Sequence, residues 1–360
     1  MAARCRSRTH TTRRIVVVLT LSLVVTSCYS GSHPTARPAR PVHDELPAAL
    51  DNGGAGQSAA SPPGHVPPPL ACPDKVRATT RSLVIRVLPD GPRARSGGLA
   101  FTAGVCVYLP PGYATSAFRY PVVYLLHGGG GDQADAVTYG HIQRVMDGLI
   151  AQDRGRAAIV VMPDGANGQW YDSVSGDLRN EEYVTKWVVP FIDRHFRTIA
   201  ARKARAIAGI SNGGYGAMLF AAKHPELFGA AGGMSSNLDA VTAASGAKFS
   251  GLRDADGSAF HANHPVELVA RLAHTDLVLD IAVRCSSEDP AALCPTQVLD
   301  AFFLGANRDF AAAVRAQTGR KARFDYQEVN GAHQWYWWSQ QLRDHQLPFL
   351  LAGLANPAKG

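Results

Sequence analysis

The 360-residue chain lacks three features that would each point to a common class of protein. Its N-terminal apolar run, Ile15 to Val25, is about eleven residues long, which is too short to cross a bilayer as a stable helix. Its histidines, cysteines and aspartates do not cluster at spacings typical of metal ligands, so no metal or organic cofactor is implied. The net charge of +7 includes five arginines near the N-terminus, and +2 remains without them. The basic composition therefore gives no reason to expect nucleic acid binding.

The short apolar run fits a signal peptide. Basic residues precede it, and it ends at Val25-Thr26-Ser27-Cys28, which resembles a bacterial lipobox. We expect residues 1–27 to be removed and Cys28 to become a lipidated N-terminus that anchors the chain to the membrane. The alternative is an ordinary signal peptide that contains a cysteine. Both interpretations predict an extracytoplasmic bacterial protein, either secreted or held at the cell membrane as a lipoprotein.

The segment that follows, residues 28–71, lacks clustered aliphatic and aromatic side chains and is rich in Pro, Gly and Ala. Such a segment cannot bury enough apolar surface to offset the entropy of ordering it. We predict a disordered tether here, followed by one folded domain over residues 72–355.

The cysteines are few, and their number suits an oxidising compartment. If Cys28 carries lipid, four cysteines remain in the mature domain, and these allow three pairings. We favour Cys72 with Cys106 and Cys285 with Cys294. Free buried thiols are the alternative, which is less common outside the cytoplasm.

The most informative motif runs from Gly209 to Gly213 and reads G-x-S-x-G around Ser211. An apolar strand-like run precedes it and a helix-like run follows, which is the setting of a nucleophile elbow. The sharp turn requires small neighbours, so that Ser211 can be presented at the N-terminus of a helix.

Two further motifs lie at the positions that this chemistry requires. The run Val122 to Leu126 leads into His127-Gly128-Gly129-Gly130-Gly131, where backbone N–H groups can face a substrate carbonyl. Near the C-terminus, His333 follows a strand-like run and precedes a helix-like run, so the order is serine, acid, histidine. Together the three motifs predict a serine acyl-transfer enzyme.

The acid is less certain from the residues alone, because two candidates follow the late apolar run Leu277 to Val283. Asp289, beside Glu288, lies on the loop that the Cys285–Cys294 pair would close, and Asp300 lies further on. A carboxylate at either place could orient the imidazole.

The order of the elements predicts an α/β fold with a mostly parallel central sheet and helices on both faces. Expected strands are residues 82–88, 104–109, 121–126, 158–162, 206–209, 230–234, 277–283 and 323–328, and Glu181 to Arg197 is expected to be one amphipathic helix. Residues 235–274 show little periodicity and are interpreted either as a cap over the site or as a solvated connection.

The residues resemble the esterase D-like α/β-hydrolases, which include feruloyl esterases, formylglutathione hydrolases and antigen 85-type mycolyltransferases. The resemblance covers nearly the whole domain and rests on Tyr124–Gly129, Val161–Gly165, the elbow with His224–Phe228, and Gly331–Trp335.

This resemblance implies that Ser211 is the nucleophile, His333 the base, and the N–H groups of Gly129 and Asn212 the oxyanion hole. The segment Val298 to Phe310 is most similar to the mycolyltransferases, in which a glutamate stands where this chain has Asp300. The resemblance therefore favours Asp300 over Asp289.

We expect a carboxylic-ester hydrolase that forms an acyl-enzyme. Mycolyltransferases have an aspartate at the position of His127, so transfer of an acyl group to a cell-envelope carbohydrate is the second interpretation. A non-catalytic envelope-binding protein with the same fold is the third. The substrate would be a small-molecule, lipid or carbohydrate ester.

Overall fold

The computed structural model describes residues 72, 82–87, 95–96, 99–100, 104–165, 169–238, 250–252, 254–284 and 297–359. Four of the features expected from the sequence lie outside the described residues: the signal peptide with Cys28, the tether, the Cys285–Cys294 pair, and Asp289 with Glu288.

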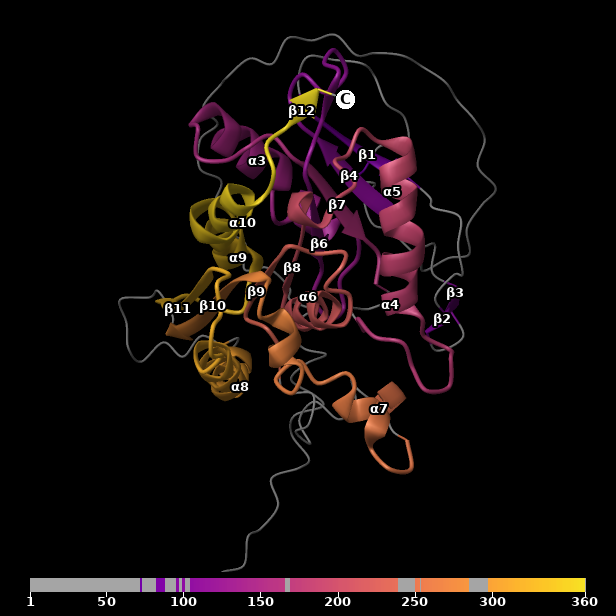
Figure 1. The fold of residues 1–360 in the computed structure, drawn as a ribbon, viewed down its shortest axis with the longest axis vertical. Helices are drawn as coiled ribbons and strands as arrows, with labels where there is room; N and C mark the ends of the chain where they lie inside the picture. Colours follow the sequence, from indigo (N-terminus) through magenta and orange to yellow (C-terminus); the bar gives the residue numbers. More distant parts are fainter. Residues whose placement is uncertain are drawn as a thin grey trace, which may run out of the picture. The chain divides into compact units, whose positions relative to one another are not determined.

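An eight-stranded sheet forms the centre of the domain, in the order β1-β4-β7-β6-β8-β9-β10-β11 (Figure 1). Its strands are β1 (Leu83–Val87), β4 (Val105–Leu109), β6 (Val122–Leu126), β7 (Ile159–Pro163), β8 (Arg205–Ile210), β9 (Ala230–Met234), β10 (Asp276–Arg284) and β11 (Phe324–Asn330). β4 pairs antiparallel with both β1 and β7, and all the other neighbours are parallel. This confirms the predicted fold class.

Helices cover both faces of the sheet. The longer helices are α3 (Ile142–Ala151), α5 (Val189–His195), α6 (Asn212–Lys223), α8 (Gln297–Arg315), α9 (Trp335–Gln341) and α10 (Leu347–Gly353). The short elements are α2 (Asp135–Thr138), α4 (Asn180–Glu182), η2 (Arg202–Ala204), η3 (Ser250–Leu252), α7 (Ser258–His261), η4 (Val269–Leu272) and the strand pairs β2 (Arg95–Ser96) with β3 (Leu99–Ala100) and β5 (Phe118–Arg119) with β12 (Ala358–Lys359).

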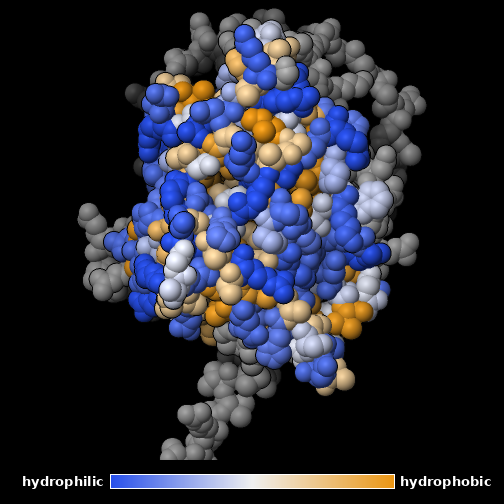
Figure 2. All heavy atoms as spheres, viewed as in Figure 1, coloured by the Kyte–Doolittle hydropathy of each residue, from blue (hydrophilic) through white to orange (hydrophobic). Residues whose placement is uncertain are grey.

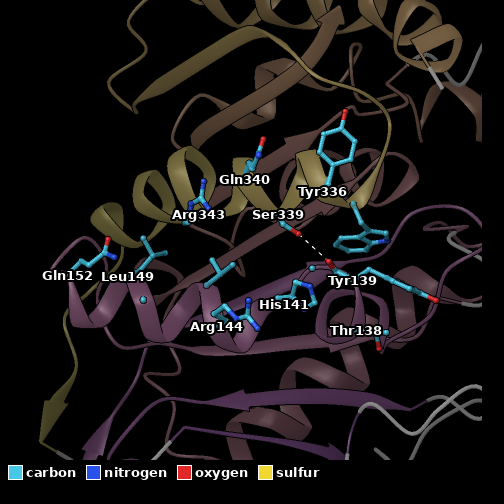
Figure 3. A pocket seen from close by; sticks show the side chains of 14 residues that line it. Thr138, Tyr139, His141, Arg144, Leu149, Gln152, Tyr336, Ser339, Gln340 and Arg343 are labelled. Atoms are coloured by element: carbon cyan, nitrogen blue, oxygen red, sulfur yellow. Dashed lines mark hydrogen bonds between the residues drawn. The ribbon is translucent and has the colours of Figure 1, made fainter. Parts of the chain in front are cut away.

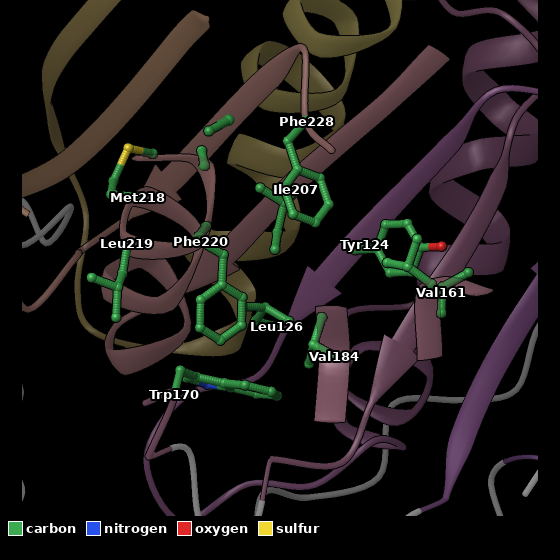
Figure 4. Close-up of a cluster of buried hydrophobic side chains, with 14 of the residues drawn as sticks. Tyr124, Leu126, Val161, Trp170, Val184, Ile207, Met218, Leu219, Phe220 and Phe228 are labelled. Atoms are coloured by element: carbon green, nitrogen blue, oxygen red, sulfur yellow. The ribbon is translucent and has the colours of Figure 1, made fainter. Parts of the chain in front are cut away.

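Alternating strand residues fill two separate hydrophobic cores, as a two-fold side-chain period requires. One core lies under α5, α6 and α8, and it includes Tyr124, Ile207 and Phe220 (Figure 4). The other lies under α3, α9 and α10, and it includes Val123 and Leu350. Polar residues cover most of the face shown in Figure 2, with apolar residues scattered among them. No helix among the described residues is long and apolar enough to span a membrane.

The predicted single helix from Glu181 to Arg197 is a compound element in the structure. A π-helix, η1 (Tyr183–Val188), separates α4 from α5. Pro190 lies in the first turn of α5 and has no N–H to donate to the preceding turn, so the wider π turn carries the chain past it. The same arrangement recurs where η5 (Leu342–Gln346) precedes α10 and Pro348.

Two further sequence predictions can be compared with the described residues. Cys72 and Cys106 form a disulfide with 5.9 Å between their Cα atoms, as predicted. Within the expected cap, Val269 and Leu272 are buried, and the Tyr215 hydroxyl donates to the Asn263 carbonyl at 2.7 Å. This part of the segment therefore packs on the domain and is not a solvated connection.

Candidate active site

Ser211 sits between β8 and α6 in a backbone conformation that few L-residues adopt, with φ 55° and ψ −117°. The surrounding sequence makes this possible because two glycines lie where the chain crosses itself. A Cβ at Gly209 would clash with the Gly213 carbonyl, and a Cβ at Gly213 would clash with the Leu126 carbonyl. The side chain that the turn presents is 8% exposed, at the N-terminus of a twelve-residue helix. The arrangement has the geometry of a nucleophile elbow.

Main-chain hydrogen bonds hold this turn against the end of β9. The Ser211 N–H donates to the Met234 carbonyl at 2.8 Å, and the Asn237 N–H donates to the Ser211 carbonyl at 3.2 Å. The Asn237 side-chain amide also donates to Asn212 Oδ1 at 3.1 Å. Residues 235–237, which we call the β9 turn, therefore fix both sides of the elbow.

The glycine loop after β6 lies beside Ser211, since a Cβ on Gly128 would be 3.5 Å from the Ser211 Cβ. His127 holds this loop. Its Nε2 accepts the Gly165 N–H at 2.8 Å, so its Nδ1 carries the proton and donates to the Gly128 carbonyl at 2.8 Å.

This contact has a consequence for the next peptide group. No peptide bond in the described residues is cis, and in a trans peptide the C=O and the following N–H point in opposite directions. Because the Gly128 carbonyl is turned toward His127, the Gly129 N–H faces away from it. Within the described chain, neither this N–H nor that of Asn212 has a hydrogen-bond partner. Both are free to bind an oxyanion.

A buried carboxyl lies under the same loop. Asp135 is 8% exposed and in close contact with the position that a Gly131 Cβ would occupy. Burial, reinforced by the charge of Asp132, raises the pKa of Asp135 to about 7. Below about pH 7 this carboxyl is therefore mostly protonated and uncharged, and it becomes negative as the pH rises through that value.

His333 pairs with Asp300. Its Nδ1 lies 3.0 Å from Asp300 Oδ1, and the Asp300 side chain is fully buried. Asp300, Phe303 and Asn307 share one face of α8 because they are three and seven residues apart. The preference for Asp300 thus coincides with a direct contact to the histidine.

Two aromatic rings fix the His333 imidazole. Phe303 lies 5.6 Å and Trp338 4.9 Å from it between ring centroids. Among the hydrogen bonds of the described residues there is none between Ser211 Oγ and His333, whose Nε2 has no partner. Contacts of this kind often tighten only when substrate is bound.

Sequence reasoning did not identify three of these supporting residues: the His127 ring, Trp338 and Asn307. Trp338 could have been suspected from its spacing of three from Trp335 on a helix, since such residues share a face. Nothing in the sequence pattern links His127 to Gly165, or Asn307 to Ser236, whose carbonyl accepts from the Asn307 side-chain amide at 2.7 Å. Both contacts depend on the tertiary fold.

A groove of about 480 Å³ flanks the site but does not include Ser211 or His333 (Figure 3). It runs between α3 and α9, and its lining includes Tyr139 and Trp335, whose ring centroids are 6.4 Å apart. The Ser339 hydroxyl donates to the Tyr139 carbonyl across it at 3.3 Å. The described residues contain no group of three or more side chains that could hold a metal ion.

The chain matches known esterases in sequence. The model of the Esterase family matches residues 96–349. Esterase Rv1288 of Mycobacterium tuberculosis is 38% identical over 143 residues, which are 39% of this chain and 30% of that protein. Diacylglycerol acyltransferase/mycolyltransferase Ag85A of Mycobacterium ulcerans is 28% identical over 209 residues, 51% of this chain and 60% of that protein. The chain thus spans less than two thirds of the length of either relative.

Solved structures of esterases and related hydrolases have the same fold as this chain. A ferulic acid esterase superposes with a TM-score of 0.60 at 25% identity, covering 77% of this chain and all of that one. An S-formylglutathione hydrolase from Agrobacterium tumefaciens superposes with a TM-score of 0.59 at 20% identity, covering 78% and 98%. With its family model matched over most of the domain, this chain belongs to the Esterase family and has the α/β-hydrolase fold.

Proposed function

We propose that the chain is a serine carboxylic-ester hydrolase that works through an acyl-enzyme. The observation that carries the proposal is the combination of Ser211 on a strained elbow with the buried Asp300–His333 pair. The 38% identity to a mycobacterial esterase supports the same activity.

The geometry supports a two-step reaction. Ser211 Oγ attacks the ester carbonyl while His333 Nε2 accepts its proton, and Asp300 stabilises the resulting imidazolium through Nδ1. The N–H groups of Gly129 and Asn212 bind the oxyanion. The alcohol leaves with the proton from His333, and water then releases the acid from Ser211 in the same way.

Activity on p-nitrophenyl acetate, with Ser211→Ala as the control, tests this proposal. We expect release of p-nitrophenol by the wild type, loss of that activity in Ser211→Ala, and an acetyl-enzyme detectable by intact mass. Equal rates in the two proteins would contradict the proposal and favour the non-catalytic envelope-binding interpretation.

Acyl transfer to a carbohydrate is the second candidate, and the similarity to the Ag85A mycolyltransferase over half of this chain favours it. Transfer uses the same acyl-enzyme, with a sugar hydroxyl in place of water. Intact-mass measurement with and without trehalose separates the two: a transferase loses the acyl group faster when trehalose is present, and a hydrolase loses it at the same rate.

We also propose that the protein is exported and held at the membrane by lipid on Cys28. The Cys72–Cys106 disulfide is consistent with an oxidising compartment. Stable retention requires more than one acyl chain. We expect the wild type to partition into detergent and Cys28→Ser to remain in the aqueous phase with its esterase activity intact. A wild type found only in the aqueous phase would leave a plain secreted protein.

A further inference from the structure

The β9 turn, residues 235–237, contacts both halves of the candidate catalytic machinery. On one side it binds the elbow: the Asn237 N–H donates to the Ser211 carbonyl, and the Asn237 side-chain amide donates to Asn212 Oδ1. On its other side it binds α8, which carries the acid, and α9, which follows the base in the chain. This position makes it the structural link between the nucleophile and the residues that activate it.

The link to the base runs through Ser235. The Trp338 indole N–H donates to Ser235 Oγ at 3.3 Å, and both side chains are buried. The same indole packs edge-on against the His333 ring at 4.9 Å. A displacement of Ser235 is therefore transmitted to the imidazole through a single side chain.

The link to the acid runs through Asn307, which is fully buried on α8. Its side-chain amide donates to the Ser236 carbonyl at 2.7 Å and to the Phe303 carbonyl at 2.8 Å. Phe303 contacts His333, and Asp300 lies on the same helix face. Asn307 thus fixes the position of α8 relative to the elbow.

The backbone of the turn is itself strained. Ser235 has φ 47°, one of four positive values among the described non-glycine residues, and Ser211 is another. Its N–H donates to the Asp280 carbonyl at 2.8 Å, which holds the residue in this conformation. Strain of this kind persists only where surrounding contacts over-determine it, and it concentrates at functional sites.

We propose that the β9 turn sets the distance between Ser211 and His333, with Ser235 and Trp338 as positioning residues for the base and Asn307 as the positioning residue for the acid. The proposal rests on the serine-esterase function proposed above. It assigns these residues no contact with substrate. They act because a misplacement of about 1 Å in a reacting pair costs on the order of a hundredfold in rate.

The experiment measures how fast diethyl p-nitrophenyl phosphate modifies Ser211. The reaction is monitored by the release of one equivalent of p-nitrophenolate. Ser211 Oγ forms the bond to phosphorus, p-nitrophenolate leaves, and the serine proton passes to His333. The reagent is small, so the rate reports the alignment of Ser211 with His333. Rates are taken per folded enzyme, with thermal unfolding as the parallel readout.

We expect Trp338→Phe and Ser235→Ala each to lower this rate by about tenfold, and the double variant to be no slower than either. Trp337→Phe is the matched control, because Trp337 is also buried on α9 but its indole N–H has no partner in the described chain. We expect that variant to react at the wild-type rate. A reaction rate equal to the wild type in Trp338→Phe, or equal losses in Trp337→Phe and Trp338→Phe, would overturn the proposal.

The outcomes also separate this inference from the function on which it rests. A wild type that reacts no faster than Ser211→Ala contradicts the proposed esterase function. Alternatively, the wild type reacts, and the rate loss in the double variant equals the product of the two single-variant losses. That result contradicts only the positioning role of the Ser235–Trp338 contact. Should Ser235→Ala fail to fold, the Trp338→Phe and Trp337→Phe pair decides alone.

Discussion

Two histidines of the C-terminal segment each bind an aspartate through Nδ1, and they differ in what lies at Nε2. His333 contacts Asp300 at 3.0 Å, and its Nε2 has no partner in the described part of the chain. His345, on η5, contacts Asp280 at 2.6 Å through Nδ1 and Asp325 at 3.1 Å through Nε2. One imidazole can exchange a proton, whereas the other is held between two carboxylates.

The contacts of His345 also determine the charge of its imidazole. Burial alone would lower the pKa of His345, but the hydrogen bonds and charges of Asp280 and Asp325 outweigh it and raise the pKa to about 9. Burial raises the pKa of Asp280 as well, and its contacts with His345 and Gln346 oppose that shift. We take the pair to be ionised at neutral pH, because Asp280 accepts hydrogen bonds at both oxygens.

A histidine–aspartate pair is therefore not evidence of catalysis by itself. What distinguishes the His333 pair is its place after the carboxyl end of β11 and an Nε2 that no described residue contacts by a hydrogen bond, whereas His345 joins the C-terminal helices to β10 and β11. The first pair suits proton transfer, and the second suits holding the fold together.

The largest effect is expected from His333→Gln compared with His345→Gln. Loss of the base should lower kcat for p-nitrophenyl acetate by several orders of magnitude, as in other relays that act as a unit. His345→Gln should change kcat of the folded enzyme by no more than a few-fold. Equal losses of kcat in the two variants, measured at a temperature where both are folded, would contradict a catalytic role for His333 and a structural role for His345.

Asp300→Asn should be next, with a loss of kcat on the order of 10⁴, because an amide can favour the wrong imidazole tautomer. Asp289→Asn is the control from the second candidate acid. A larger loss in Asp289→Asn than in Asp300→Asn would transfer the role to the loop after β10.

His345→Gln should mainly reduce stability, by about 3–5 kcal/mol at neutral pH, because it leaves the Asp280 charge buried without its cation. The sign with pH follows from the raised pKa of His345. Its contribution is fully present below its ordinary pKa of about 6.5 and is lost as pH rises through about 9. Urea unfolding at about pH 6 and about pH 10 should show a large and a small difference, respectively. A constant difference would contradict the ionised pair.

The smallest effect is expected from Asp325→Asn, about 1 kcal/mol or less, because the side chain of Asp325 is 45% exposed and its ion pair is screened by water. The variant should also lower the pKa of His345, which NMR titration of the ring can measure. No change in that pKa would show that Asp280 alone determines it.

The sequence predicted the elements that depend on local pattern. The G-x-S-x-G turn, the glycine loop after a β-rich run and the approximate extent of the strands all follow from residue types at fixed spacing. Ser211 and His333 could be proposed from their motifs, but Asp300 could be preferred to Asp289 only through a resemblance, because α8 has to pack beside His333 before the acid and the base meet.

Other features could not be predicted because they depend on contacts distant in sequence. The Trp338–Ser235 bond spans 103 residues, and the His127–Gly165 bond spans 38. The π-helices were missed for another reason: apolar periodicity indicates a helix but not the width of its turns, and the chain passes each proline by widening one turn. The apolar periodicity was correct even though the hydrogen-bonding pattern was not.

The Cys72–Cys106 disulfide determines how mechanical load from the N-terminal segment enters the domain. Within the described part of the chain, strand β1 is an edge strand whose only partner is β4, so a pull on its own backbone would separate it from the sheet one hydrogen-bonded pair at a time. The disulfide lies upstream of β1 and joins the chain directly to β4. Tension applied to the chain upstream of Cys72 therefore bypasses β1 and reaches a buried strand that has neighbours on both sides. Reduction of this bond should leave the unloaded domain folded and lower the force at which β1 detaches.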